Sequence, residues 1–169
     1  PFYQSVSILH LSAIDKKKYM EFAQHHFRMA QKNIDVTVID SLYNRFEGIT
    51  WYLQKILNIL FAITPQGKSC DKAKIEQAID FILDSYSFTY SELLYQLPEK
   101  QKELMIAICK EGKATALTSG KFIRKYSLPS SSSVQSALKG LLEKDFVTET
   151  DGTYELYDKF FGEWLKKEL

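Results

Sequence analysis

Cysteine is scarce in this sequence, which contains only Cys70 and Cys109. The two lie far apart and form no Cys-x-x-Cys pair, which fits two reduced thiols better than a disulfide framework and gives no zinc-ligand spacing. Reduced thiols are typical of a cytoplasmic protein, and we expect that location. No apolar run reaches the roughly 18 residues that a membrane-spanning helix needs. We expect no signal peptide and no contact with a membrane.

Signatures of nucleotide and catalytic sites are missing as well. The sequence has no Gly-x-x-x-x-Gly-Lys-Ser/Thr phosphate loop, no Gly-x-Gly-x-x-Gly and no nucleophile elbow. His25 and His26 are adjacent in an expected helix and point about 100° apart, so they cannot face one ligand. We therefore expect no catalytic residue, no metal and no cofactor in this chain, and we expect that it is not itself an enzyme.

The charges nearly cancel, since 22 basic and 21 acidic residues leave a net charge of +1. No global field attracts nucleic acid or a membrane surface. The charges are unevenly distributed along the chain, however. Residues 112–140 contain five basic residues and no acid, whereas residues 145–155 contain four acids and no base.

Helical periodicity dominates the first half. Apolar residues recur at helical spacing over residues 15–31, 37–46, 50–63 and 71–86, with an extension over 89–97. Asp15 is a predicted N-cap, and Pro98 ends the last helix. A short apolar run over residues 6–11 indicates a strand. We therefore expect a helical bundle over residues 15–97, preceded by a strand within residues 1–14.

A different order of elements follows Pro98. Helices are predicted over residues 99–110, 118–126 and 131–144, and the third carries Val134, Ala137, Leu138, Leu141 and Leu142 at the spacing of an amphipathic helix. Runs over 146–150 and 153–157 flank Asp151-Gly152, a strong hairpin signal. A last helix runs from Asp158 through Leu165. Three helices followed by a hairpin are typical of a winged helix-turn-helix domain, here residues 98–169. The expected fold class is mainly α, a helical bundle followed by a winged helix with a β-hairpin wing.

The third helix of this domain exposes small polar groups, an amide and a lysine opposite its apolar stripe. Such side chains suit a helix that reads a DNA groove, and a helix N-terminus accepts phosphate. The acidic hairpin would repel DNA phosphates, so contact with DNA and contact with a protein both stay open, and we prefer the protein. The candidate residues for DNA or partner binding are Lys121, Arg124, Lys125, Ser132, Ser133, Gln135, Ser136 and Lys139.

Several segments resemble archaeal-type ATPases of the AAA+/STAND group of P-loop proteins, and the resemblance spans nearly the whole chain. These segments are Pro1-Phe2-Tyr3-Gln4-Ser5, Ile8-Leu9-His10-Leu11, Phe46-Glu47-Gly48-Ile49-Thr50-Trp51-Tyr52-Leu53-Gln54, Leu97-Pro98-Glu99-Lys100-Gln101-Lys102-Glu103-Leu104, Ser132-Ser133-Val134-Gln135-Ser136-Ala137-Leu138 and Tyr157-Asp158-Lys159-Phe160-Phe161-Gly162-Glu163-Trp164-Leu165.

The resemblance implies that residues 1–14 end a nucleotide-binding core, that 15–97 form its helical lid and that 98–169 form its winged helix. Because the sequence opens at Pro1 without Met, we expect a fragment whose upstream core binds ATP and Mg. Many lids of this group place an arginine after a Gly-x-Pro turn, whereas Gly48-Ile49-Thr50-Trp51 has neither Pro nor Arg. The resemblance therefore implies no γ-phosphate sensor here, but Trp51 or Tyr52 is a candidate to approach the adenine.

The resemblance implies a regulatory or interaction module that couples the nucleotide state of the core to a protein or DNA partner. The alternative is a stand-alone winged-helix transcriptional regulator with a helical dimerisation or effector domain. We also expect the apolar strand near the N-terminus to pair with another copy of the chain, which would make a homo-oligomer, or to lie on the helical domain.

Overall fold

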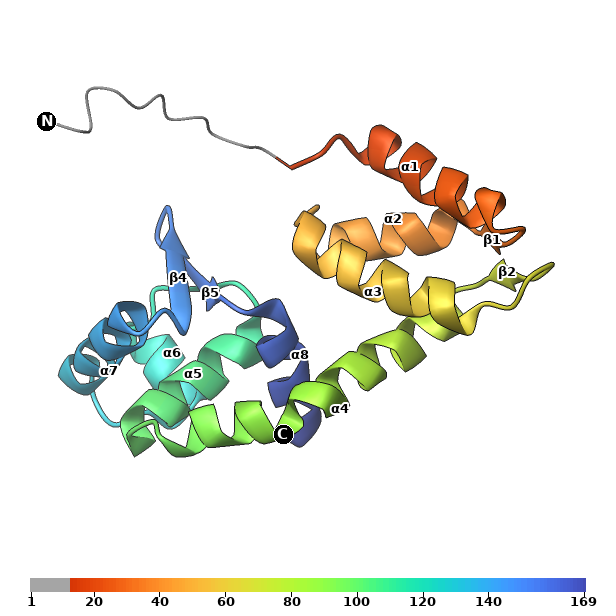
Figure 1. Cartoon of the computed structure of the whole chain (residues 1–169). Coiled ribbons are helices and arrows are strands. Elements are labelled where there is room, and N and C mark those ends of the chain that lie inside the picture. The colour runs from red at the N-terminus through yellow and green to blue at the C-terminus, as the bar shows by residue number, and fades with distance from the viewer. Residues whose placement is uncertain (1–12) are drawn as a thin grey trace, which may run out of the picture. The chain divides into compact units, whose positions relative to one another are not determined.

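The computed structural model describes residues 13–169. These residues form two compact units that divide between Ile82 and Leu83, and helices dominate in both (Figure 1). Within the described residues no helix is long and apolar enough to cross a membrane. The strand predicted over residues 6–11 lies outside the described part of the chain.

The first unit is a bundle of helices with a small pairing of two strands. Its elements are α1 (Lys16–Met29), β1 (Asn33–Ile34), α2 (Val36–Arg45), α3 (Thr50–Ile63), β2 (Ser69–Cys70) and the first part of α4 (Ala73–Tyr95). β1 and β2 pair in parallel, a contact that the sequence analysis did not predict. The predicted helices over 15–31, 37–46 and 50–63 are confirmed within a few residues at each end.

Aspartate caps and fully buried apolar side chains hold this bundle together. The Asp15 carboxylate accepts a hydrogen bond from the Lys18 amide at 3.1 Å, and Asp35 does the same for Thr37 at 2.8 Å. Each cap satisfies a backbone donor that the first helical turn leaves without a partner. Phe22 of α1 lies at helical spacing with Tyr19 and Ala23 but is 47% exposed. The apolar side chains buried most completely are Val38, Ile39, Leu42, Phe46, Leu53, Ile56, Leu60, Ile79 and Ile82.

Helix α4 is one continuous helix, whereas the sequence analysis divided it into residues 71–86 and 89–97. The predicted interruption contains no Gly or Pro, so nothing in residues 87–88 breaks the backbone hydrogen bonds. Pro98 then ends the helix as expected, and α5 begins at the next residue.

The second unit contains the helices and hairpin that the sequence predicts. Its elements after α4 are α5 (Glu99–Glu111), β3 (Ala114–Thr115), α6 (Gly120–Lys125), α7 (Ser131–Glu143), β4 (Val147–Thr150), β5 (Thr153–Leu156) and α8 (Lys159–Glu168). The strand order is β3-β5-β4, with antiparallel pairing throughout. The hairpin of β4 and β5 projects from the helices as a wing (Figure 1).

The turn of the wing has the geometry that its sequence predicts. Asp151 has φ of 50° and Gly152 has φ of 73°, and Thr150 pairs with Thr153 across the turn. Positive φ at both central residues defines a type I′ turn, which matches the right-handed twist of the two strands. The Glu149 carboxylate accepts a hydrogen bond from the Gly152 amide at 3.0 Å and supports the turn.

The core of the second unit places α7 against α5, and only part of the predicted stripe on α7 is fully buried. Val134, Ala137 and Leu141 are buried, whereas Leu138 and Leu142 are only half-buried. The buried positions follow i, i+3 and i+7, so the other two lie at the edge of the stripe. The predicted apolar stripe of α7 therefore faces the core, but Leu138 and Leu142 are less buried than its other members.

The last turns of α4 belong to the second unit. The Tyr90 hydroxyl donates to Asp158 at 3.1 Å, and the Trp164 indole nitrogen donates to Ser87 at 3.3 Å. The Tyr90 ring also lies 5.2 Å from the Phe161 ring, between centroids. The sequence analysis placed the boundary at residues 97 and 98, whereas the second compact unit begins at Leu83.

Candidate winged-helix interface

Helix α7 exposes the polar face that the sequence analysis selected. Ser132, Gln135, Ser136 and Lys139 are exposed, and Ser133 is half-buried. The turn before α7 positions this face, because the Ser130 hydroxyl accepts a hydrogen bond from the Ser133 amide at 3.2 Å. Ser130 is thus the N-cap of α7.

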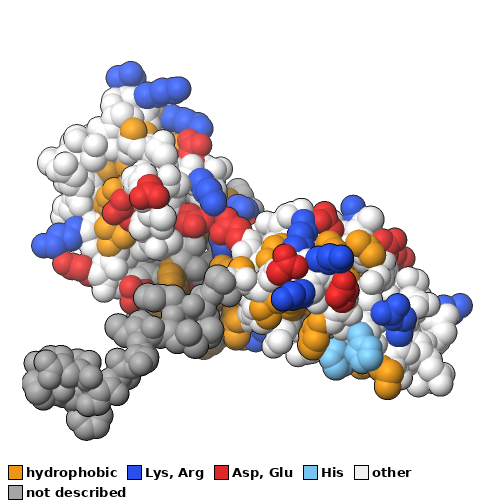
Figure 2. All heavy atoms as spheres, turned by 90° about the horizontal axis from the view of Figure 1, so that it is seen from above, with side chains coloured by type: hydrophobic (Ala, Val, Ile, Leu, Met, Phe, Trp, Pro, Cys, Tyr) orange, Lys and Arg blue, Asp and Glu red, His pale blue; other side chains and the backbone are white. Residues whose placement is uncertain are grey.

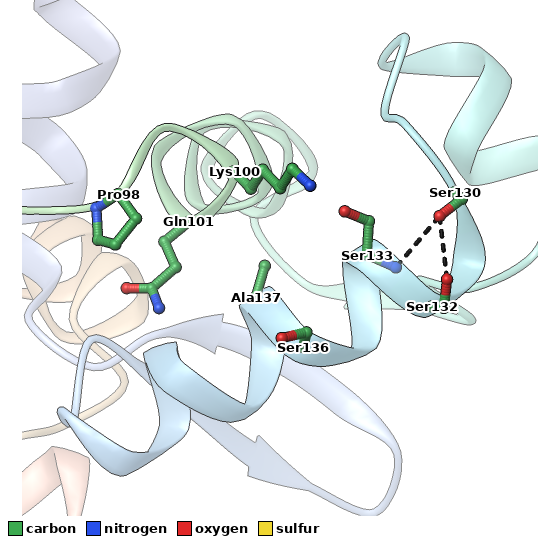
Figure 3. Close-up of a pocket in the computed structure, with 8 residues that line it drawn as sticks. All are labelled: Pro98, Lys100, Gln101, Ser130, Ser132, Ser133, Ser136 and Ala137. Carbon is green, nitrogen blue, oxygen red and sulfur yellow. Dashed lines mark hydrogen bonds between the residues drawn. The ribbon is translucent and has the colours of Figure 1, made fainter.

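A polar groove of about 460 Å³ runs between the first turns of α5 and α7. Figure 3 shows Lys100 extending from α5 towards the start of α7, with the Ser130 hydroxyl joined to Ser132 and Ser133 by hydrogen bonds. The groove brings together three of the predicted residues, Ser132, Ser133 and Ser136. The remaining lining residues are Pro98, Lys100, Gln101, Ser130 and Ala137.

The α5 side of this groove was not predicted. The Gln101 amide nitrogen lies directly over Gly140 of α7, where a Cβ atom would collide with it. Its carbonyl oxygen accepts a hydrogen bond from the Lys144 ammonium at 3.4 Å. The sequence signal for Gln101 is a polar side chain three and four residues before buried Leu104 and Met105, on the same face of α5.

The basic residues of the predicted interface differ in their partners. Lys125 of α6 forms an ion pair with Glu111 at 2.6 Å, and the Tyr126 hydroxyl donates to the same carboxylate oxygen at 2.8 Å. The hydrogen bond from Lys125, followed by the one from Tyr126, lowers the pKa of the Glu111 carboxyl. The hydrogen bond to Glu111 in turn raises the pKa of Lys125. The Lys139 ammonium lies 3.7 Å from a carboxylate oxygen of Glu143. Both side chains are exposed, so this ion pair contributes little to stability.

Lys121 and Arg124 of α6 are both exposed, on the same short helix as Lys125. On the face of the molecule that Figure 2 displays, basic and acidic side chains are interspersed over both units. The wing carries Glu149, Asp151 and Glu155, and Glu155 is within 3.4 Å of Lys159. The wing therefore brings negative charge to a domain whose α6 is basic.

The two residues proposed to approach an adenine differ in accessibility. Trp51 is 54% exposed, whereas Tyr52 is 7% exposed and its ring stacks on Phe46 at 5.6 Å between centroids. Trp51 is thus the one that a ligand reaches without rearrangement of the core. Its role in nucleotide contact stays a prediction.

The histidine and cysteine side chains of the described residues are possible ligands of a metal ion. Among residues 13–169 no group of three or more His, Cys, Asp and Glu side chains is arranged to hold a metal ion. The rings of His25 and His26 are 5.5 Å apart between centroids and nearly perpendicular, and both side chains are exposed. The ring of His26 also lies 4.5 Å from that of Phe22, between centroids. Cys70 and Cys109 are buried free thiols, and burial raises the pKa of both.

Residues 88–167 match the model of a family described as a probable winged helix domain. The match begins in α4 and ends in α8, so it covers the helices, the three-stranded sheet and the wing. The second unit is a winged helix. In this unit α7 is the helix that directly precedes the hairpin of the wing.

No curated protein matches the sequence. Among solved structures, the Walker-type ATPase of Pyrococcus abyssi is similar to it, with a TM-score of 0.66 and 17% identity. The likeness covers 91% of this chain but only 42% of that ATPase, so it extends over both units of this chain. At this level of identity it shows the fold, a helical bundle followed by a winged helix.

Proposed function

We propose that this chain is the C-terminal regulatory and interaction module of an archaeal-type ATPase of the AAA+/STAND group. In this proposal the first unit is the lid of a nucleotide-binding core, and the winged helix couples the nucleotide state of that core to a partner. The observation that carries the proposal is the shared succession of helical bundle and winged helix with a Walker-type ATPase, over 91% of this chain.

The proposal assigns ATP and Mg to a core upstream of this chain and not to the chain itself. No phosphate loop occurs in residues 1–169, so the groups that hold the β- and γ-phosphates are lacking. Isothermal titration of the chain with Mg-ATP tests this point. We expect no heat of binding, and micromolar affinity would contradict the assignment.

The face of α7 and its groove with α5 are the surface by which the module contacts its partner. Hydroxyl and amide groups from Ser132, Ser136 and Gln101 converge there, which suits hydrogen bonding to a polar protein surface. The ion pair of Lys125 with Glu111 and the acidic wing weaken attraction to DNA. A protein or intramolecular partner is therefore preferred.

Hydrogen exchange in the full-length gene product tests the coupling. The amides of α5 and α7 that border the groove should differ in protection between the ATP-bound and ADP-bound states. The matched control is a full-length variant whose phosphate loop no longer binds ATP, in which the difference should disappear. Identical protection in all nucleotide states, or a gene product without a phosphate loop, would refute the proposal.

DNA binding by a stand-alone regulator is the second candidate function. It is favoured by the exposed Gln135, Ser136 and Lys139 on α7 and by the absence of acidic residues over 112–140. Such an interface makes at most about five phosphate contacts, so its affinity should fall with about the fourth to fifth power of salt concentration.

Fluorescence anisotropy on a random duplex at two salt concentrations separates the candidates. We expect weak binding at low salt, lost on Arg124→Ala with Lys125→Ala and strengthened on Glu149→Gln with Asp151→Asn. Lys17→Ala with Lys18→Ala removes the same charge from the first unit and serves as the control. Sequence-selective nanomolar binding at physiological salt would favour the regulator instead.

A further inference from the structure

A cleft of about 350 Å³ lies between α1 and α3, within the first unit. Four aromatic side chains line it. Those of Tyr19 and Phe27 are buried, whereas Phe22 is 47% exposed and Phe61 is half-buried. Small-molecule sites are usually apolar hollows of this kind, and a cavity of roughly 150 Å³ is enough to hold benzene. The cleft therefore has room for a ligand larger than one six-membered ring.

Both helices contribute aromatic rings to the cleft. Phe27 of α1 and Phe61 of α3 meet edge to face, with 5.2 Å between their centroids. The Phe22 ring lies 4.5 Å from that of His26 and 6.1 Å from that of Tyr19, between centroids. Aromatic rings gain from edge-to-face or offset contact with further rings in addition to the burial of their area. An aromatic ligand therefore suits this lining better than an aliphatic one of the same size.

The lining of the cleft carries no full charge. In the described part of the chain its lining residues include no Asp, Glu, Lys or Arg, and its polar side chains other than Tyr19 are the exposed Gln54, Asn58 and His26. The Lys32 ammonium lies outside the lining, 4.2 Å from the centroid of the Phe61 ring, and donates to the Phe61 carbonyl at 2.6 Å. A cation would meet this ammonium, and an anion would meet the negative faces of the rings. The cleft therefore matches a neutral ligand.

The Tyr19 hydroxyl adds a hydrogen-bonding group to one wall of the cleft. Tyr19 is 2% exposed, and its hydroxyl oxygen is buried without a hydrogen-bond partner among the described residues. Burial raises the pKa of Tyr19 to about 12, because the charged phenolate is costly to bury, so the hydroxyl stays protonated and able to donate near neutral pH. A buried donor without a partner is unfavourable, and buried polar groups in proteins are seldom left in this state.

We propose that this cleft binds a neutral aromatic small molecule of about two fused rings, which accepts a hydrogen bond from the Tyr19 hydroxyl. The volume sets the size of the ligand, the uncharged lining sets its charge, and the unpartnered hydroxyl sets its polar group. The proposal does not rest on the proposed regulatory function, because the site lies wholly within the first unit and requires neither an upstream core nor a partner on α7.

The test is a titration of the whole chain with quinoline, a neutral molecule of two fused rings with one acceptor nitrogen, followed by the chemical shifts of backbone amides in α1 and α3. Tyr19→Phe keeps the ring and removes the donor, so quinoline should bind about five-fold more weakly, the effect of one hydrogen bond. Naphthalene has the same rings without the acceptor, and its affinity should be the same for Tyr19→Phe as for the unaltered chain. Tyr19→Phe should not lower the melting temperature, because the hydroxyl has no hydrogen bond to lose.

A second substitution tests the location of the bound probe. Asn58 is an exposed lining residue, and the ring of Asn58→Phe should obstruct the cleft and abolish quinoline binding. Glu21→Phe is the matched control, because it adds the same ring at an exposed position of α1 that does not line the cleft. Circular dichroism establishes that each variant is folded.

Four results would contradict the proposal. Quinoline does not bind, it binds Asn58→Phe as well as it binds the unaltered chain, or its affinity is unchanged in Tyr19→Phe. The fourth is binding to this chain but not to the full-length gene product, which would show that another part of the protein covers the cleft.

Discussion

Replacement of Tyr90 by alanine tests whether the end of α4 is part of the winged helix. Tyr90 is 5% exposed, and its ring lies 5.2 Å from that of Phe161 and 5.7 Å from that of Trp164, between centroids. Loss of a buried aromatic side chain leaves a cavity and removes its contacts, so Tyr90→Ala should lower the free energy of unfolding by about 3 to 5 kcal/mol.

Two further substitutions divide this effect into its parts. Tyr90→Phe keeps the ring and removes the hydroxyl that donates to the Asp158 carboxylate, so a loss of about 1 to 2 kcal/mol is expected. Tyr95→Ala is the matched control on the same helix, because Tyr95 is 80% exposed. A surface substitution of this kind should change stability by about 0.5 kcal/mol or less.

Urea unfolding followed by tryptophan fluorescence measures these differences. The chain has two tryptophans, and in a Trp51→Phe background the signal comes from Trp164, which belongs to the second unit. The expected order of destabilisation is Tyr90→Ala, then Tyr90→Phe, then Tyr95→Ala. If Tyr90→Ala fell within about 1 kcal/mol of Tyr95→Ala, the end of α4 would not be part of the domain core.

Three more predictions follow from burial and backbone geometry. In the same urea assay, Leu141→Ala should lower the free energy of unfolding by about 2 to 5 kcal/mol, and Leu138→Ala, at a half-buried position, by about 1 to 2 kcal/mol. Equal losses would contradict the face of α7 that the structure buries. Gly48→Ala should lower the melting temperature of the first unit by circular dichroism, because Gly48 has φ of +70° and an added Cβ would lie 2.7 Å from a tyrosine ring. Cys70 and Cys109 should not react with a thiol reagent near neutral pH until urea unfolds the chain. Burial limits the access of the reagent and raises the pKa of both thiols. Rapid reaction of the native chain would refute their burial.

The elements that the sequence predicted well are those specified by a few adjacent residues. Asp151-Gly152 determines its own turn, because both residues tolerate positive φ. Ser130 and Asp158 are helix N-caps whose side chains bond to amides two or three residues later. Such local hydrogen bonds need no tertiary context, so the winged-helix order could be predicted before any packing was known.

The missed features depend on pairs of residues far apart in the chain. The pairing of Ile34 with Cys70 involves two-residue strands that have no periodicity to detect. The boundary of the winged helix depends on Tyr90 reaching Asp158, a contact across 68 residues. Pro98 indicated the end of a helix correctly, but the end of a helix is not the edge of a domain.

In the candidate interface, too, the features set by local sequence could be predicted, and those that depend on tertiary contacts could not. The exposed face of α7 could be predicted from amphipathic spacing alone, but its groove needs Gln101 to lie over Gly140. The sequence analysis counted five basic residues and no acid over residues 112–140 and so overstated the positive charge of this region. Glu111 lies just before that segment and forms an ion pair with Lys125 within it. Pairing across 14 residues cannot be inferred from a run of charges.

The distribution of charge decides which ligand suits each surface of the winged helix. DNA affinity grows with the number of phosphates contacted at once, so a DNA-reading domain needs basic groups on its recognition helix, the helix before it and its wing. Here α7 contributes Lys139 beside Glu143, and the wing contributes Glu149 and Asp151. The α7 groove is therefore better suited to hydrogen bonding with a protein surface than to a row of DNA phosphates.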